Sequence, residues 1–197
     1  MVRLFNGRDG EWASRVTSVG KKAVELVPEH VSAPQEAVPD LWLCAAPLKR
    51  GRIDWVAEKA CELGVARFVP VLTRRTVVDK LNLERLHAHM VEAAEQCGRT
   101  ALPELAEPVT LAALLKSWPG GRQLIFADET GGVPLASLTL KAPAAILIGP
   151  EGGFDPAERA AIAAIAEATA VTLGPRILRA DTAAVAAIAV WQALARE

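Results

Sequence analysis

Residues 146–154 read Ile146-Leu-Ile-Gly-Pro-Glu-Gly-Gly-Phe154, and this stretch is the most informative part of the sequence. An apolar run from Ala144 to Ile148 leads into three glycines and a proline within five residues. A helix start follows at once, because Asp155 is a suitable N-cap, Pro156 suits the first helical position and Glu158 completes a capping box. The pattern therefore predicts a buried strand, a tight glycine turn and a helix.

The glycine turn follows the carboxyl end of its strand, where α/β sheets bind ligands. Without Cβ atoms, its backbone groups can approach a ligand closely. A phosphate site is disfavoured, because the turn has no lysine and Glu151 would repel an anion. The acidic turn instead suits a positively charged ligand, such as the sulfonium of S-adenosylmethionine. An ordinary strand-to-helix turn is the plain structural alternative.

A second informative stretch is Leu173-Gly-Pro-Arg-Ile-Leu-Arg-Ala-Asp-Thr-Ala183. A short strand ends in Gly-Pro, and Asp181 or Thr182 could cap the helix that follows. Arg176 and Arg179 lie in the connecting loop. A lone loop arginine is usually a solvated surface residue, but these two flank the same glycine-rich edge, which favours a functional role.

Strand and helix patterns alternate after residue 40, which predicts an α/β fold with a mostly parallel sheet covered by helices on both faces. The predicted strands are 41–46, 68–72, 123–127, 144–148 and 171–173, and the predicted helices are 54–63, 83–97, 111–118 and 182–195.

The first 30 residues show a different pattern, with short strands at 3–5, 12–19 and 23–27. A proline-containing stretch from Pro28 to Pro39 indicates a linker. We therefore expect a small β segment over 1–35 and a larger domain over 40–197. The small segment is too short to bury a core of its own.

The last predicted helix, 182–195, is apolar on nearly every side, which indicates burial on more than one face. A subunit interface explains this economically, so we expect a dimer. The longest apolar stretches, Ala142–Ile148 and Ala183–Trp191, are far shorter than the roughly 18 residues of a membrane span.

No export signal opens the chain, and its three cysteines contain no CxxC pair. This pattern disfavours a metal site or a disulfide framework and favours a reducing cytoplasm. We expect Cys44, Cys61 and Cys97 to be small buried residues.

A net charge of −1 does not by itself indicate a nucleic-acid binder, so any RNA contact must come from a local patch. The segment from Pro47 to Lys80 contains eight basic residues and four acidic residues. This segment, including Lys49, Arg74 and Arg75, is the candidate RNA surface together with Arg99. A solvated helix face with paired charges is the alternative.

Together these segments resemble the ribosomal RNA small subunit methyltransferase E family, in the SPOUT class of knotted methyltransferases. The specific matches are 147–154 and 173–183; weaker ones are Lys49 with Asp54, Lys59 and 62–65, and 95–99. The resemblance implies a C-terminal trefoil knot, a homodimer and S-adenosylmethionine bound in the knot. It also implies methylation of N3 of a uridine in 16S rRNA, free or within the 30S subunit.

A mechanism for this reaction gives expected roles to individual residues. Arg179 or Arg176 would stabilise the anion that develops on the uracil. Glu151 and Asp181 are candidate bases, although capping and backbone bonding explain each equally well. The backbone around the two stretches would hold the cofactor, at Leu147, Gly149, Pro150, Glu151, Gly152, Gly153, Leu173, Gly174, Ile177 and Leu178.

The N-terminus departs from the family pattern, since only the later part of a PUA-like β-barrel is recognisable in the first 25 residues. We expect this shortened segment to weaken independent RNA binding. Three alternatives stay open: a SPOUT enzyme acting on tRNA, a non-enzymatic RNA-binding module, and a phosphate-dependent nucleotide enzyme.

Overall fold

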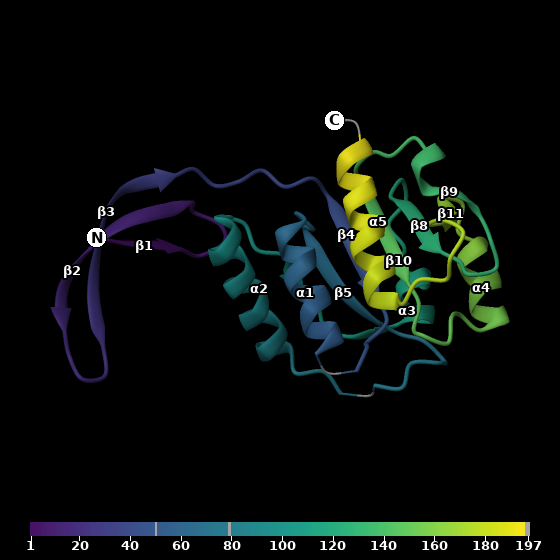
Figure 1. Cartoon of the computed structure of the whole chain (residues 1–197), viewed down its shortest axis with the longest axis horizontal. Coiled ribbons are helices and arrows are strands. Elements are labelled where there is room, and N and C mark those ends of the chain that lie inside the picture. The colour runs from purple at the N-terminus through teal and green to yellow at the C-terminus, as the bar shows by residue number, and fades with distance from the viewer. Residues whose placement is uncertain (50, 79, 196–197) are drawn as a thin grey trace.

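The computed structural model describes residues 1–49, 51–78 and 80–195, so Arg50 and Asp79 of the basic segment lie outside it. The described chain forms a three-stranded antiparallel sheet and a larger parallel sheet with helices (Figure 1). Within this part of the chain, no helix is both long and apolar enough to cross a membrane.

The N-terminal sheet has the order β1-β2-β3, with β1 at Val2–Phe5, β2 at Glu11–Val19 and β3 at Val24–Ala33. The predicted linker was therefore wrong in its first six residues, because β3 continues from Pro28 to Ala33. Pro28 pairs with Ser14 on an edge strand, beside a register shift. Proline is tolerated at such positions because no ladder hydrogen bond is lost.

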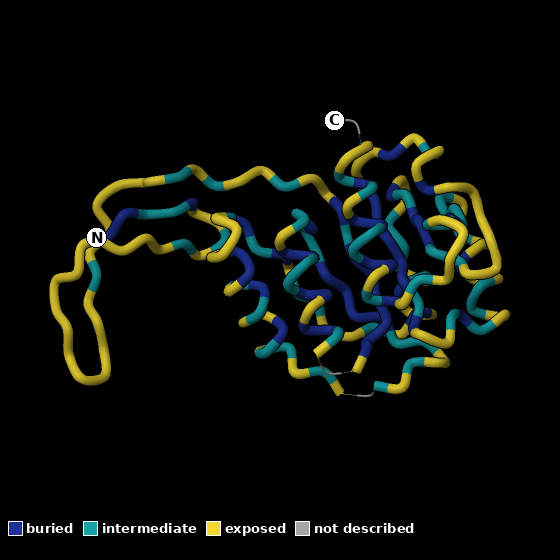
Figure 2. Tube along the Cα trace, in the orientation of Figure 1, coloured by how far each residue is buried: buried dark blue, intermediate teal, exposed yellow. Residues whose placement is uncertain are grey.

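The outer part of this sheet is exposed to solvent. Figure 2 shows β2 and β3 extending from the α/β body as an exposed loop of chain. Within these two strands only Ala13 and Ser14 are buried, while Val19 is 74% exposed.

The chain between the two sheets is held near its start by contacts of two neighbouring residues, Gln35 and Glu36. Gln35 accepts a hydrogen bond from the Gly10 N–H (2.9 Å) and donates one to the Gly7 carbonyl (3.1 Å). The Thr100 hydroxyl accepts from the Glu36 N–H (2.8 Å), just beyond the end of α2 (Leu83–Cys97). These contacts attach the N-terminal sheet to the end of one helix.

The larger sheet has the strand order β6-β5-β4-β10-β8-β11-β9, with β7 beside β5, and its neighbouring strands are parallel. The parallel α/β fold predicted from the sequence is thus confirmed. The strands are β4 (Leu41–Ala45), β5 (Arg67–Leu72), β6 (Glu104–Leu105), β7 (Val109–Thr110), β8 (Gln123–Ala127), β9 (Val133–Pro134), β10 (Ala144–Ile148) and β11 (Ala168–Thr172).

Helices cover both faces of this sheet. One face carries α1 (Arg52–Glu62), α2 and α5 (Ala180–Leu194), and the other carries α3 (Leu111–Lys116) and α4 (Pro156–Ala163). Because successive side chains of a strand point to opposite faces, Ile146 and Ile148 of β10 join the first core and Leu147 joins the second.

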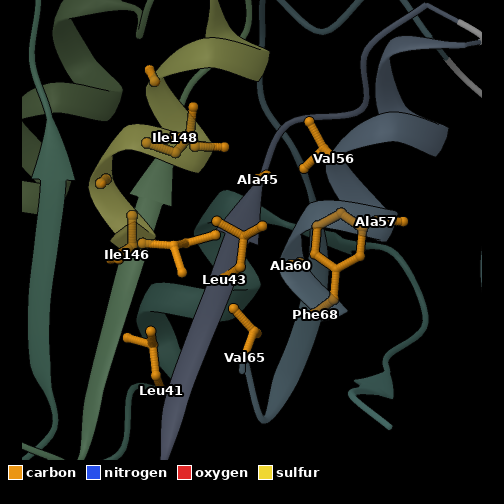
Figure 3. Close-up of a cluster of buried hydrophobic side chains, with 14 of the residues drawn as sticks. Leu41, Leu43, Ala45, Val56, Ala57, Ala60, Val65, Phe68, Ile146 and Ile148 are labelled. Carbon is orange, nitrogen blue, oxygen red and sulfur yellow. The ribbon is translucent and has the colours of Figure 1, made fainter. Parts of the chain in front are cut away.

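The first core is built around the pairing of β4 with β10. Leu43 lies opposite Ile146 in the register, and Figure 3 shows the two side chains next to each other. Phe68 of β5 lies beside Ala57 and Ala60 of α1 in the same view. All of these residues are at most 1% exposed, so the sheet and α1 form one packed unit.

The cysteine expectation holds for two of the three residues. Cys44 and Cys61 are buried, and burial raises the pKa of the Cys44 thiol to about 12. Cys97 is exposed, contrary to expectation, because it is the last residue of α2 and the buried stripe of that helix ends at Ala94.

Replacing Val71 with Ala should lower the free energy of unfolding by about 2 kcal/mol, because its fully buried side chain would leave a cavity in the second core. Val19→Ala is the matched control, at a strand position that is 74% exposed, and should change stability by less than about 0.5 kcal/mol. Urea denaturation followed by circular dichroism measures both. Equal losses in the two variants would contradict the assignment of the core.

Candidate functional site

A cavity of about 610 Å³ opens at the carboxyl ends of β8, β10 and β11. Three loops far apart in the sequence form most of its wall, and the start of α1 closes one side. This is the edge of a parallel sheet at which ligands bind in α/β proteins. The wall includes Ala127–Glu129 and Gly131, Ile148–Glu151 with Gly153 and Phe154, Val171–Ala180, and Lys49 with Arg52.

The predicted glycine turn supplies one wall of the cavity. Gly149, Pro150, Glu151 and Gly153 all line it, and the Gly153 N–H donates to the Pro150 carbonyl (2.8 Å) to close the turn. Gly153 has a φ of +67°, a left-handed conformation that favours glycine. A Cβ at this position would also lie 2.5 Å from a carboxylate oxygen of Glu129.

The helix start after the turn is formed as the sequence predicts. Asp155 caps α4 by accepting from the Ala157 N–H (3.0 Å), and Glu158 accepts from the Asp155 N–H (3.1 Å). This capping box, with Pro156 at the first position, fixes where the glycine turn ends.

Two predicted cofactor residues do not line the cavity. Leu147 is fully buried, and its side chain lies in the second core, on the α3 and α4 face of the sheet. Gly152 is the other, and its carbonyl accepts a hydrogen bond from Arg75 (2.6 Å).

The loop after β8 supplies a wall that sequence reasoning missed. Asp128 and Glu129 line the cavity, and Asp128 forms an ion pair with Arg159 of α4 (2.9 Å). The signal was present, because an acidic pair follows a predicted buried strand at its carboxyl end. The acidic pair could be assigned to the cavity only once β8 was known to lie next to β10, and the sequence does not show this strand order.

The arginine loop, residues 173–179 between β11 and α5, forms another wall. Leu173, Gly174, Ile177 and Leu178 line the cavity, as predicted for cofactor contacts, and so do Arg176 and Arg179. Both arginine residues are exposed, and neither forms an ion pair with another described residue. Their guanidinium groups are thus available to an anionic or polar ligand.

The predicted caps of the last helix were wrong. Arg179 is the N-cap of α5, and Asp181 and Thr182 lie within its first turn. The Asp181 carboxylate instead accepts a hydrogen bond from Arg52 of α1 (2.9 Å). Of the two candidate bases, Asp181 is therefore paired and only 15% exposed, whereas the Glu151 side chain is 56% exposed at the cavity.

The four predicted RNA-binding residues do not form one surface. Lys49 lines the cavity, and the Arg74 side chain is 67% exposed beside Asp155. Arg75 holds the glycine turn through Gly152. Arg99 differs from the others, because its side chain is 8% exposed, pairs with Glu36 and donates to the Cys61 carbonyl.

No group of three or more histidine, cysteine or acidic side chains that could hold a metal ion occurs among the described residues.

Comparison with known proteins identifies the family. Residues 34–192 match the model of the RNA methyltransferase domain family. The ribosomal RNA small subunit methyltransferase E of Rickettsia conorii is 30% identical over 95% of this chain and 78% of its own length.

Two solved structures share the fold over nearly the whole chain. A methyltransferase of Legionella pneumophila in complex with S-adenosylmethionine has a TM-score of 0.88 and 32% identity, over 97% of this chain and 81% of that one. The ribosomal RNA small subunit methyltransferase E of Neisseria gonorrhoeae, also bound to S-adenosylmethionine, has a TM-score of 0.86 and 28% identity, over 98% and 83%. The chain belongs to the ribosomal RNA small subunit methyltransferase E family.

Proposed function

We propose that this protein uses S-adenosylmethionine to methylate N3 of one uridine in 16S ribosomal RNA. The observation that carries the proposal is the cavity itself, which is lined by the glycine turn and by Arg176 and Arg179, two arginines that form no ion pair with the described residues. Family membership supports the reaction class, and two similar proteins bind S-adenosylmethionine.

The cavity suits such a cofactor in size and charge. Its volume of about 610 Å³ lies within the range of small-molecule sites, roughly 300–1,000 Å³. Asp128, Glu129 and Glu151 line it together with five basic residues, so carboxylates are available on its wall to a cationic sulfonium and an ammonium group. Gly149 and Gly153 keep the wall free of Cβ atoms, which leaves the backbone polar groups accessible.

We assign cofactor binding to the residues of the glycine turn and the arginine loop that line the cavity. These are Gly149, Pro150, Glu151, Gly153, Leu173, Gly174, Ile177 and Leu178, with Asp128 and Glu129 as additions. When bound, the cofactor supplies a methyl group on a positively charged sulfur.

The protein must orient the uracil and help remove its N3 proton. We assign orientation and charge stabilisation to Arg179 and Arg176, because a guanidinium beside a ring oxygen favours the deprotonated ring. Glu151 is the better placed of the two candidate bases, because its side chain is 56% exposed and lies 4.0 Å from Arg52, whereas Asp181 is 15% exposed and bound to Arg52 at 2.9 Å.

The RNA strand would approach the cavity over Lys49 and Arg74. Lys49 lines the cavity and Arg74 lies beside the start of α4, so both adjoin the site. Arg75 is adjacent but already bound to Gly152. Arg99 is left out of this surface because its guanidinium is buried and paired.

Several architectural expectations accompany the proposal. We infer a C-terminal trefoil knot, supported by the placement of β10 between β4 and β8 and by the crowding of the loops after β8, β10 and β11. We also infer two units, 1–35 and 40–197, with the first as part of a PUA-like β-barrel. Homodimerisation through α5 and action in the cytoplasm, on free 16S rRNA or the 30S subunit, complete the proposal.

The protein should transfer methyl groups to unmodified 16S rRNA or 30S subunits and leave tRNA unlabelled. Incubation with methyl-labelled S-adenosylmethionine, nuclease digestion and mass spectrometry should identify 3-methyluridine. Labelling of tRNA alone would support the tRNA-modifying alternative. Absence of label in both RNAs, with no binding of S-adenosylhomocysteine, would refute the enzyme assignment.

Gly153→Ala should weaken binding of S-adenosylhomocysteine about tenfold, because a side chain at φ +67° costs roughly 1–2 kcal/mol and displaces Glu129. Gly98→Ala is the matched control: its φ is +71°, but nothing lies within 4 Å of the added Cβ and the residue caps α2 away from the cavity. Isothermal calorimetry measures both affinities. Equal weakening in the two variants would show that the effect is global destabilisation.

Arg179→Ala should lower kcat for methyl transfer at least about 100-fold, through lost charge stabilisation, while affinity for S-adenosylhomocysteine stays nearly unchanged. Arg67→Ala, at the first residue of β5 and thus at the opposite edge of the sheet, is the control. Unchanged turnover in the Arg179 variant would remove this residue from the mechanism.

A further inference from the structure

An ion pair that the mechanism does not use lies beside the cavity. Arg52 donates to the Asp181 carboxylate (2.9 Å) and lies 4.0 Å from the Glu151 carboxylate. The pair joins residues 129 positions apart in the chain. One guanidinium therefore links the start of α1, the glycine turn and the first turn of α5.

The position of Arg52 is not explained by helix α1. It is the first residue of that helix, where the macrodipole disfavours a positive charge. Asp181, in contrast, lies in the first turn of α5, where a carboxylate is favoured. The positive charge of Arg52 thus destabilises the N-terminus of α1, whereas the negative charge of Asp181 stabilises the N-terminus of α5.

The start of α5 sets the position of the arginine loop. Arg179 is the N-cap of α5, but its side chain makes no capping hydrogen bond. The Ala183 N–H donates to the Arg179 carbonyl (2.8 Å), so the backbone of Arg179 is bound to the first turn of the helix. Whatever holds Asp181 therefore also holds Arg179, two residues earlier.

Partial burial and a rigid helix strengthen the contact between Arg52 and Asp181. The Asp181 side chain is 15% exposed and that of Arg52 is 34% exposed, so water screens the pair only partly. Helix α1 packs directly against α5 and against the sheet, which gives Arg52 a rigid base. Figure 1 shows the two helices side by side.

We propose that Arg52 is a positioning residue: through Asp181 and Glu151 it holds the arginine loop and the glycine turn in register across the cavity. This inference rests on the proposed methyl transfer for its catalytic consequence, but its structural consequence can be measured independently. It also gives Asp181 the role of anchor rather than base.

Hydrogen exchange tests the structural consequence without any activity measurement. In Arg52→Ala, exchange of the amides from Arg176 to Ala183 should accelerate about tenfold or more, as local opening becomes easier. Arg85→Ala is the matched control, because Arg85 forms a similar pair with Asp54 (3.1 Å; side chains 28% and 11% exposed) away from the cavity wall. Unchanged exchange in this segment for the Arg52 variant, or equal acceleration in the control, would overturn the proposal.

Kinetics test the catalytic consequence. Arg52→Ala and Asp181→Asn should each lower kcat about tenfold, with a smaller change in KM for RNA, since misalignment of the reacting groups slows the chemical step. Arg52→Lys should recover part of the loss, and the double variant should be no slower than Arg52→Ala, because Arg52→Ala already lacks the contact that Asp181→Asn removes. Multiplicative losses, or a kcat equal to that of Arg85→Ala, would contradict the positioning role.

The proposal and the proposed function can fail separately. If the unmodified protein transfers no methyl group, the proposed function fails, and the exchange experiment still decides the role of Arg52. If the protein is active and the Arg52 variant is equally active with unchanged exchange, only the positioning role is refuted.

Discussion

The burial of β10 on both faces of the parallel sheet is the constraint on which the rest of the structure depends. Its five residues are at most 3% exposed, and it pairs with β4 on one side and β8 on the other. A strand so placed can lead only to the edge of the sheet, where the glycine turn begins. The cavity therefore lies where the packed core ends, and its main wall is attached to the most constrained strand.

Contacts of three arginine side chains then hold the cavity walls. Arg75 binds the carbonyl of Gly152, Arg52 binds Asp181, and Arg159 pairs with Asp128. Arg176 and Arg179 are left without ion pairs among the described residues. The basic residues of the site thus fall into two groups. Arg52, Arg75 and Arg159 hold the walls, whereas Arg176 and Arg179 remain available to a ligand.

Charge in the sequence did not distinguish these roles. Lys49, Arg74 and Arg75 of the basic segment were grouped with Arg99 as one candidate RNA surface, yet the Arg99 side chain is 8% exposed and contacts Glu36 and Cys61. Arg99 helps to attach the chain between the two sheets to the end of α2, next to Thr100. A buried, paired arginine has lost the solvation and the freedom that a phosphate contact requires.

Local sequence patterns determined several of the helices and strands of this protein. Periodicity and turn residues were sufficient for β8, β10, α2 and the capping box of α4, because these depend on neighbours within a few residues. The partner of Asp181, the removal of Leu147 from the cavity and the contribution of Asp128 and Glu129 were decided only by the tertiary structure. Each depends on which strands are adjacent and which face a side chain takes, and such relations join residues up to 129 positions apart that no local pattern connects.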